Sequence, residues 1–165
     1  GQPDAQTGSR NAYGANALCV VRVRMSGRDN QCLIRSGQYW SSTTGHERDM
    51  YLNDIPPVLQ RCMTFLRDEG ATVGCLSCRF MQALVSDTGE PLEKSFGLAW
   101  FDDLRNLERW AKTHPTHVEI FGGFMQDVQT LNFHVQLRLY PEMAVIPSEA
   151  QYSEYLHCHP GRGSV

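Results

Sequence analysis

Two hydrophobic periodicities alternate along this chain, and the order in which they alternate limits the folds open to it. Segments in which every second residue is apolar predict half-buried strands, whereas apolar residues at three- and four-residue steps predict amphipathic helices. These segments follow one another as strand, helix, strand, strand, helix, helix, strand, strand. The order predicts an α+β fold with an antiparallel sheet and helices on one face, and a ferredoxin-like repeat is its nearest named plan.

Turn residues and breaks in the apolar pattern set the expected boundaries. Expected strands cover residues 16–25, 32–36, 72–84, 94–101, 133–139 and 150–157, and residues 142–146 continue extended. Expected helices run from near Glu47 to the stop signal at 68–70, over 102–110, and from His114 towards Gln129. Pro56 and Pro57 interrupt the first helical pattern, so we expect either a kink or two helices there.

Length and charge bound the classes of function. A chain of 165 residues is long enough for one sizeable core and too short for two. Residues 1–15 are polar and lack periodicity, so we expect a flexible tail and a single domain over residues 16–165. The net charge of −3 offers no basic stripe, which argues against a nucleic-acid partner. With neither a long apolar run nor a basic-then-apolar leader, we expect no membrane partner and a cytoplasmic location.

Six cysteines permit three disulfides, but their surroundings favour free thiols. Three of them lie in apolar segments, where a thiol behaves as a small hydrophobic side chain: Cys19, Cys32 and Cys62. Cys75 and Cys78 have the spacing of a zinc or redox pair, yet no second pair accompanies them. Because residues three apart on a strand point to opposite faces, we expect these two thiols to lie on different sides of the sheet.

The segment from His114 to Phe124 is the strongest candidate site. Pro115 favours a helix start, and His114 and His117 then project from nearly the same face of that helix. Apolar residues supply the surface beside them: Val118, Phe121 and Phe124. An imidazole with one free nitrogen beside aromatic walls is what the proximal side of a haem pocket needs. A plain helix start, with one capping and one exposed histidine, explains the same residues, and the local chemistry alone favours it.

Two other histidine positions are weaker candidates. His134 falls on the polar phase of an expected strand, which predicts a solvent-facing side chain. His157, Cys158 and His159 are too close together in an extended chain for all three to converge on one metal ion.

Several longer phrases are more specific than any spacing rule. In chain order they are Leu33-Ile-Arg-Ser-Gly-Gln-Tyr-Trp40, Glu47-Arg-Asp-Met-Tyr-Leu-Asn-Asp54, Phe65-Leu-Arg-Asp-Glu-Gly70, Glu93-Lys-Ser-Phe-Gly-Leu-Ala-Trp100, Leu107-Glu-Arg-Trp-Ala111, His114-Pro-Thr-His-Val-Glu-Ile-Phe121 and Glu154-Tyr-Leu-His-Cys-His-Pro160. Together they resemble the C-terminal part of the haem-containing aldoxime dehydratases, enzymes that turn aldoximes into nitriles. The resemblance runs from about Gln31 to Gly161.

This resemblance implies a cofactor, a reaction and a set of site residues. It implies haem b in a ferredoxin-like fold of the dimeric α+β barrel type, and a ferrous iron that binds the aldoxime through nitrogen and polarises its N–O bond. His117 aligns with the proximal iron ligand. Phe121, Phe124 and Met125 are candidates for the lining of the cofactor pocket, although core packing explains the same residues equally well. Ser36 aligns with a distal serine whose hydroxyl can hydrogen-bond the oxime oxygen. Without the resemblance, Ser36 is a polar residue capping the end of a strand.

The chain departs from the family pattern in two respects. Pro141 stands where the family has its distal histidine, and proline cannot donate or shuttle a proton, so dehydration by the family's route is in doubt. The family's N-terminal half has no counterpart here. We therefore expect either a homodimer or a second chain that supplies this half. The alternatives to an aldoxime lyase are a haem enzyme for another N–O or N–N bonded substrate and a non-catalytic subunit of a two-chain haem protein.

Overall fold

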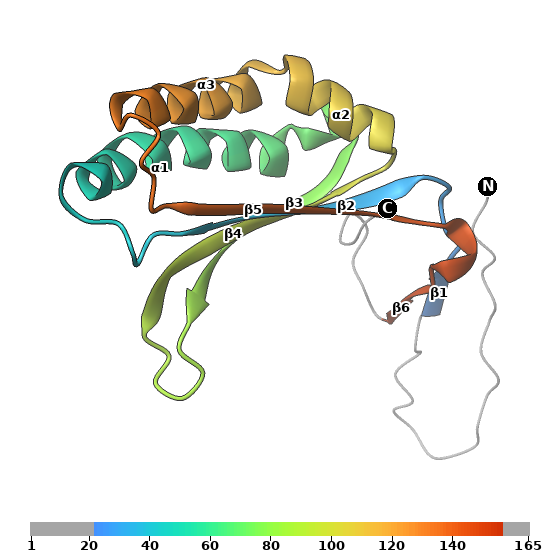
Figure 1. Cartoon of the computed structure of the whole chain (residues 1–165). Coiled ribbons are helices and arrows are strands. Elements are labelled where there is room, and N and C mark those ends of the chain that lie inside the picture. Colours follow the sequence, from blue (N-terminus) through green and yellow to red (C-terminus); the bar gives the residue numbers. More distant parts are fainter. Residues whose placement is uncertain (1–21, 157–165) are drawn as a thin grey trace.

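A four-stranded antiparallel sheet with helices on one face forms the body of the protein (Figure 1). The computed structural model describes residues 22–156. The sheet strands are β2 (Gln31–Tyr39), β3 (Cys75–Leu84), β4 (Pro91–Phe101) and β5 (Arg138–Ile146), in the order β3-β4-β2-β5. The helices are α1 (Gly45–Asp68), α2 (Leu104–Thr113) and α3 (Pro115–Thr130), with short 3-10 turns η1 (Gly70–Val73) and η2 (Ser148–Ala150). β1 (Arg22–Met25) and β6 (Ser153–Leu156) pair in a separate two-stranded ribbon.

The connectivity of the sheet is that of a ferredoxin-like fold. β2 leads through α1 to β3, a hairpin leads to β4, and α2 and α3 return the chain to β5 beside β2. The expected α+β class, with helices on one face of an antiparallel sheet, is therefore confirmed. No helix among residues 22–156 is long and apolar enough to cross a membrane.

The two faces of the sheet differ in burial, and we call them the helix side and the open side. Along β4, residues Ser95, Gly97, Ala99 and Phe101 are buried, whereas the residues between them are only half-buried. The first set faces the helices, because a Cβ at Gly97 would lie 2.9 Å from the Met63 sulfur of α1. The core on this side is made of Cys32, Cys62, Leu66, Cys75, Cys78, Ala99, Phe101, Leu107 and Trp110.

Register then assigns the other strands to the two sides. Cys32 and Ile34 of β2 belong to the core or pack against it, so Ser36 and Gln38 of the same phase also lie on the helix side. The β5 residues paired with these four share that side: Val145, Met143, Pro141 and Leu139. The open side carries the alternate residues, among them Leu33, Arg35, Phe96, Leu98, Trp100 and Tyr140. No helix of the described chain covers the open side (Figure 1).

α1 runs through both of its prolines as one helix, so the two-helix alternative is wrong. Pro56 and Pro57 remove the amide hydrogen bonds that the carbonyls of Leu52 and Asn53 would otherwise accept. Leu52 and Asn53 are exposed, so water can satisfy those carbonyls. Packing of the buried side of the helix then holds the remaining turns together.

The strand expected at residues 133–139 is misplaced. Asn132 and Phe133 adopt positive φ angles of 51° and 64°, and β5 begins only at Arg138. The left-handed residues follow the end of α3 and turn the chain back towards the sheet. An alternation of apolar and polar residues does not predict such a turn. The strand then continues through Pro141 to Ile146, because β5 is an edge strand and tolerates a residue without an amide hydrogen.

The expectation that Cys75 and Cys78 point to opposite faces is wrong. A register shift between Cys75 and Ser77 inserts one extra residue into β3, and both thiols become buried in the core. Cys32 and Cys62 join them as free buried thiols. Burial raises the pKa of these thiols to about 11 or 12, which keeps them protonated and unreactive. No group of three metal-ligating side chains occurs in the part of the chain that the structure describes.

Several expectations lie outside the described residues. They concern the tail at residues 1–15, the beginning of the strand at 16–25, Cys19, and the cluster of His157, Cys158 and His159.

Candidate functional site

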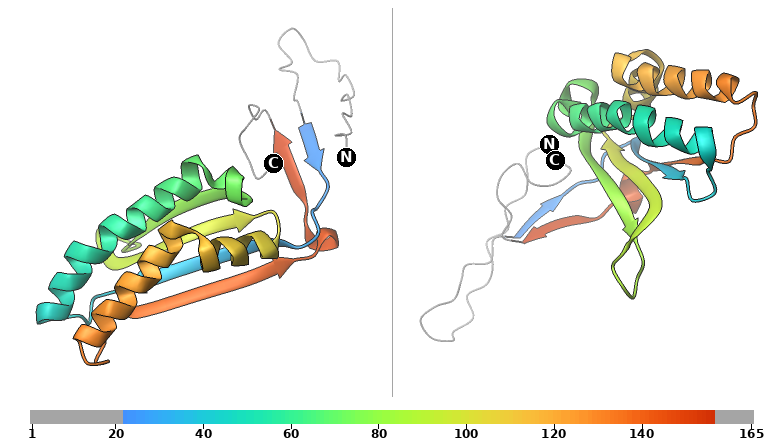
Figure 2. Two further views of the ribbon diagram at one scale, coloured as in Figure 1. Left: turned by 90° about the horizontal axis from the view of Figure 1, so that it is seen from above. Right: turned by 90° about the vertical axis from the view of Figure 1, so that its left-hand side faces the viewer.

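Exposed apolar side chains lie on the helix side of β5 and on α3. α3 packs mainly against α1 and α2, contains no buried residue, and lies raised above β2 and β5 rather than on them (Figure 2). The helix side of β5 is accordingly open, with Leu139, Met143 and Val145 exposed by 44%, 56% and 44%. On α3, Val118 and Phe121 are also exposed. A flat apolar group is the kind of ligand that such surfaces can bind.

His117 projects from the first turn of α3 towards the core. Its ring meets the edge of Trp110 of α2, with the ring centroids 4.7 Å apart. Its Nδ1 is buried and has no hydrogen-bond partner within residues 22–156. Burial lowers the pKa of His117, and an interaction with the Ala111 backbone only partly offsets this effect. Burial thus favours the neutral form of the imidazole, the form in which a ring nitrogen can bind a metal.

His114 has a different environment, and its ring is already engaged. It is the N-cap of α3, where its Nδ1 accepts the backbone N–H of Thr116 and lies 2.9 Å from the Thr116 hydroxyl. The ring also stacks on Phe65 with centroids 4.2 Å apart. Of the two histidines that the helix start offers, His114 acts as the cap and His117 remains available.

Ser36 lies at the middle of β2 on the helix side. Its partners in register are Gly97 of β4 and Pro141 of β5. The Ser36 hydroxyl makes no hydrogen bond to any residue of the described chain, and its two nearest cross-strand neighbours have no polar side-chain atoms. A ligand on this side of the sheet would therefore find a free hydroxyl on a largely apolar surface.

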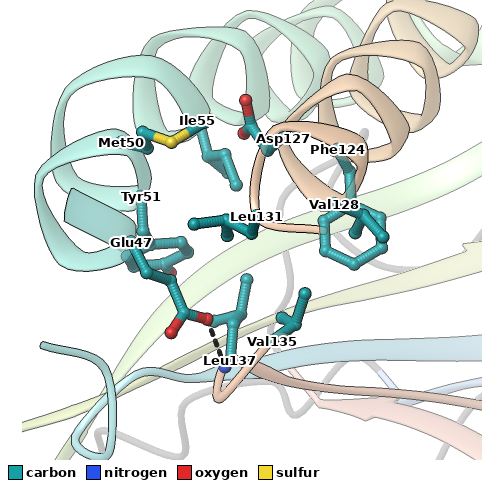
Figure 3. A pocket seen from close by; sticks show the side chains of 10 residues that line it. All are labelled: Glu47, Met50, Tyr51, Ile55, Phe124, Asp127, Val128, Leu131, Val135 and Leu137. Atoms are coloured by element: carbon teal, nitrogen blue, oxygen red, sulfur yellow. Dashed lines mark hydrogen bonds between the residues drawn. The ribbon is translucent and has the colours of Figure 1, made fainter. Parts of the chain in front are cut away.

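Phe121 and Phe124 have different surroundings. Phe121 is 62% exposed, one helical turn beyond His117. Phe124 instead lines a small pocket between α1, α3 and the chain that enters β5 (Figure 3). The pocket lining is mostly apolar and comprises Glu47, Met50, Tyr51, Ile55, Phe124, Asp127, Val128, Leu131, Val135 and Leu137.

His134 is exposed, as expected, although it lies in the turn before β5 and not in a strand. Its Nδ1 lies 2.9 Å from the carbonyl of Asn132. The structure therefore does not bring His134 to the row of residues that contains Ser36.

Sequence reasoning missed a buried polar network next to Ser36. The Ser95 hydroxyl donates to Oε1 of Gln38 at 3.0 Å, and a hydrogen bond joins Ser95 to the Tyr51 hydroxyl. All three residues are at most 5% exposed. The sequence could have indicated Gln38, because side chains alternate along a strand and residues two apart, such as Ser36 and Gln38, lie on the same side of the sheet.

Sequence reasoning also missed the role of Glu47. Its Oε1 accepts the backbone N–H groups of Gln136 and Leu137 at 2.7 and 2.9 Å, and Figure 3 shows the bond to Leu137. The carboxylate joins the first turn of α1 to the entrance of β5, although 89 residues separate the partners. No local pattern predicts a contact over such a separation.

The observed groups fit haem in two respects. His117 would hold the haem iron through its imidazole, whose Nδ1 has no hydrogen-bond partner among the described residues. The uncovered apolar residues of α3 and β5 suit the faces of a porphyrin.

Known proteins resemble this chain over most of its length. Residues 3–164 match the sequence model of a family described as haem-containing dehydratase. An aliphatic aldoxime dehydratase of Rhodococcus globerulus is 44% identical over 144 residues, which cover 87% of this chain and 40% of the relative. A phenylacetaldoxime dehydratase of Bacillus sp. (strain OxB-1) is 34% identical over 142 residues, which cover 86% of this chain and 40% of the relative.

A solved structure agrees with this similarity. A crystal structure of an aldoxime dehydratase in complex with butyraldoxime has a TM-score of 0.76 and 43% identity, and the match covers 87% of this chain and 39% of that one. The chain thus spans about 40% of the length of the relatives that it matches.

Proposed function

Since this chain belongs to the haem-containing dehydratase family, we propose that it binds haem b through His117 and serves the conversion of an aldoxime into a nitrile and water. The observation that carries the proposal is the half-buried His117, whose buried Nδ1 has no hydrogen-bond partner among residues 22–156, on the same helix as the exposed Val118 and Phe121. The relatives are named as dehydratases of aliphatic aldoximes and of phenylacetaldoxime, which supports an aldoxime as the substrate class. The activity belongs to proteins of greater length, so this chain contributes to it with further residues that it does not contain.

The proposed roles belong to residues of both layers, the helices and the sheet. Ferrous haem, when bound, supplies a metal that takes the substrate nitrogen and weakens its N–O bond. His117 holds the iron from the α3 layer and, as a neutral ligand, adds no charge. Ser36, in the sheet layer, donates its hydroxyl hydrogen to the oxygen of the substrate and orients it. Phe121 and Phe124 add aromatic surface to the cofactor pocket.

Pro141 favours a second candidate function. It lies directly opposite Ser36 in register, on the same side of the sheet, and offers no proton. Tyr140 and Glu142 flank it but belong to the open side, and a Cβ at Gly37 of β2 would overlap the Tyr140 ring. A site without a nearby acid suits a haem enzyme for another N–O or N–N bonded substrate, whose reaction needs less proton transfer. A non-catalytic subunit that keeps the fold is the remaining alternative.

The open side of the sheet supports the proposal of a partner. Its central residues Leu33, Phe96, Leu98 and Trp100 are only half-buried, and no helix of residues 22–156 lies over them. We propose that a second copy of the chain, or a second chain that supplies the remaining length of the relatives, covers this face.

An absorbance spectrum tests the proposed function most directly. The purified protein, supplied with haem, is measured in the oxidised form and then reduced with dithionite, with and without an aliphatic aldoxime. We expect a Soret band that shifts when the oxime is added to the ferrous protein, followed by a nitrile in the product analysis. A Soret shift without nitrile would favour the second candidate function, and a protein that stays colourless would contradict both haem functions.

A further inference from the structure

One level of the open side carries charges of both signs, in a row that crosses all four strands of the sheet. Strand pairing places Arg79 of β3 beside Leu98 of β4. The same level continues with Arg35 of β2 and ends with Glu142 of β5. Because paired residues share a side of the sheet, the row has a cation at one edge and a carboxylate at the other. Glu142 is the only carboxylate among the open-side residues of the four described strands.

The two ends of this row remain available to a partner. Arg79 is exposed at the edge of the sheet and forms no ion pair with any residue of the described chain. Arg35 is already engaged, because its Nε lies 3.2 Å from an oxygen of Glu142 and its guanidinium lies over the rings of Phe96 and Tyr140. The Glu142 side chain is nevertheless 63% exposed, so the carboxylate can accept a second cation.

The next level of the open side also lacks a polar complement. It runs from Met81 through Phe96 and Gly37 to Tyr140. The Tyr140 hydroxyl is buried and makes no hydrogen bond within residues 22–156. A group that covers this face with an acceptor above Tyr140 would satisfy that hydroxyl.

A second copy of the chain supplies both complements when it is related to the first by a two-fold axis along the strands. Such an axis, placed between two facing sheets, lays β3 of one copy over β5 of the other and leaves positions along the strands unchanged. Arg79 of each copy then faces Glu142 of the other, and Met81, whose sulfur is a weak acceptor, faces Tyr140. A two-fold axis across the strands would instead lay β3 over β3 and give Arg79 no carboxylate.

We propose that the open side binds a second copy of this chain face to face about the axis along the strands, with Arg79 of each copy paired to Glu142 of the other. The β3–β4 hairpin and the β1–β6 ribbon extend from the sheet on this same side and bound the face (Figures 1 and 2). Complementary charges contribute mainly to the register and specificity of such an interface. This inference rests on the partner that the proposed function assigns to the open side, and not on the binding of haem.

The test is a charge exchange followed by sedimentation of the purified full chain. Arg79→Glu and Glu142→Arg each place like charges opposite one another, so each should raise the Kd of the dimer at least about tenfold. A mixture of the two variants can form a mixed dimer in which both facing pairs carry opposite charges. We therefore expect the dimer to return when Glu142→Arg, labelled with a fluorophore, is mixed with Arg79→Glu.

Arg138→Glu is the matched control, because it reverses a charge on β5 and on the same side, but at a different level. It should dimerise like the wild type and fail to recruit the labelled Glu142→Arg variant. Arg79 is exposed, so Arg79→Glu retains the fold, and a wild-type Kd for this variant alone would overturn the proposal, as would a mixture that stays monomeric. A monomeric wild type would overturn self-association altogether. A missing Soret band would overturn the haem function instead, so the two failures are distinguishable.

Discussion

At the scale of single residues, the two histidines at the start of α3 differ in chemistry despite their similar positions. Pro115 lies between them in the first turn, and only three residues separate the rings. His114 uses its Nδ1 to cap the helix, whereas the Nδ1 of His117 is buried and has no partner within the described part of the chain. The two rings also meet different side chains, Phe65 for His114 and Trp110 for His117.

This difference predicts opposite results for two alanine variants. His117→Ala should abolish haem retention during gel filtration, because it removes the proposed iron ligand. His114→Ala should keep the haem but lose about 1 kcal/mol of stability with the N-cap. The Soret absorbance per protein and a urea titration measure the two effects. Haem retention in His117→Ala with an unchanged spectrum would make His114 the ligand.

Tyr51 gives a pH dependence of stability at high pH. Burial raises the pKa of Tyr51 to about 12, from 10.0 in an exposed tyrosine. Between these values the folded protein keeps a proton that the unfolded chain has lost, so the free energy of unfolding falls as the pH rises from 10 to 12. The loss amounts to roughly 2–3 kcal/mol over this range.

Denaturant titrations at several pH values between 9 and 12 measure this loss. Tyr51→Phe should show a smaller decline than the wild type, since its side chain cannot ionise. Tyr152→Phe, at a site that is 73% exposed, is the control and should decline like the wild type. Equal declines in all three proteins would show that Tyr51 ionises normally.

At the scale of elements, the entrance of β5 depends on α1. The chain leaves α3 through two left-handed residues, and the Glu47 carboxylate then accepts two backbone N–H groups just before the strand begins. The register of β5 decides which of its residues face the helices, because a slip of one residue would exchange Pro141 for Tyr140 or Glu142 opposite Ser36. Glu47 therefore contributes to the candidate site without contacting it.

Removal of this carboxylate should destabilise the protein. Glu47→Ala leaves two backbone donors without their acceptor, and we expect a loss of about 2 kcal/mol, because hydrogen bonds to charged groups are strong. Glu47→Gln, which keeps a neutral acceptor, should lose less. Thermal unfolding measures both effects. The control Glu149→Ala, at an exposed position in η2, should stay within about 0.5 kcal/mol of the wild type. A Glu47→Ala variant as stable as this control would contradict the role of the carboxylate.

At the scale of the whole molecule, helices cover one face of the sheet and leave the other bare. The open side combines half-buried apolar residues with Arg35, whose guanidinium lies over the rings of Phe96 and Tyr140. The relatives are more than twice as long as this chain. Two sheets can pack face to face through apolar faces of this kind, which supports the proposed partner.

Self-association gives a direct test of that face. We expect sedimentation of the purified chain to show a dimer, and Leu98→Glu on the open side to shift it towards monomer, because burying a charge opposes association. Lys112→Glu, on the exposed surface of α2, is the control and should leave the mass unchanged. A monomeric wild type would contradict self-association and leave a separate chain as the remaining partner.

The sequence by itself determined the class of fold and the nature of the candidate ligand. Apolar periods are local, so the order of strands and helices, the cap of α3 and the helical spacing of His117 and Phe121 could be read from short segments. The motifs around Ser36 and His117 indicated the protein family, and the similarity to known proteins confirms it.

Only the tertiary structure decided how these residues combine. The bulge in β3, the left-handed turn before β5 and the continuity of α1 through two prolines depend on long-range packing that overrides local preference. The pairing of Ser36 with Pro141 and the hydrogen bond between Ser95 and Gln38 join residues more than fifty positions apart. Such contacts arise from strand register and burial, which no local pattern in one sequence encodes.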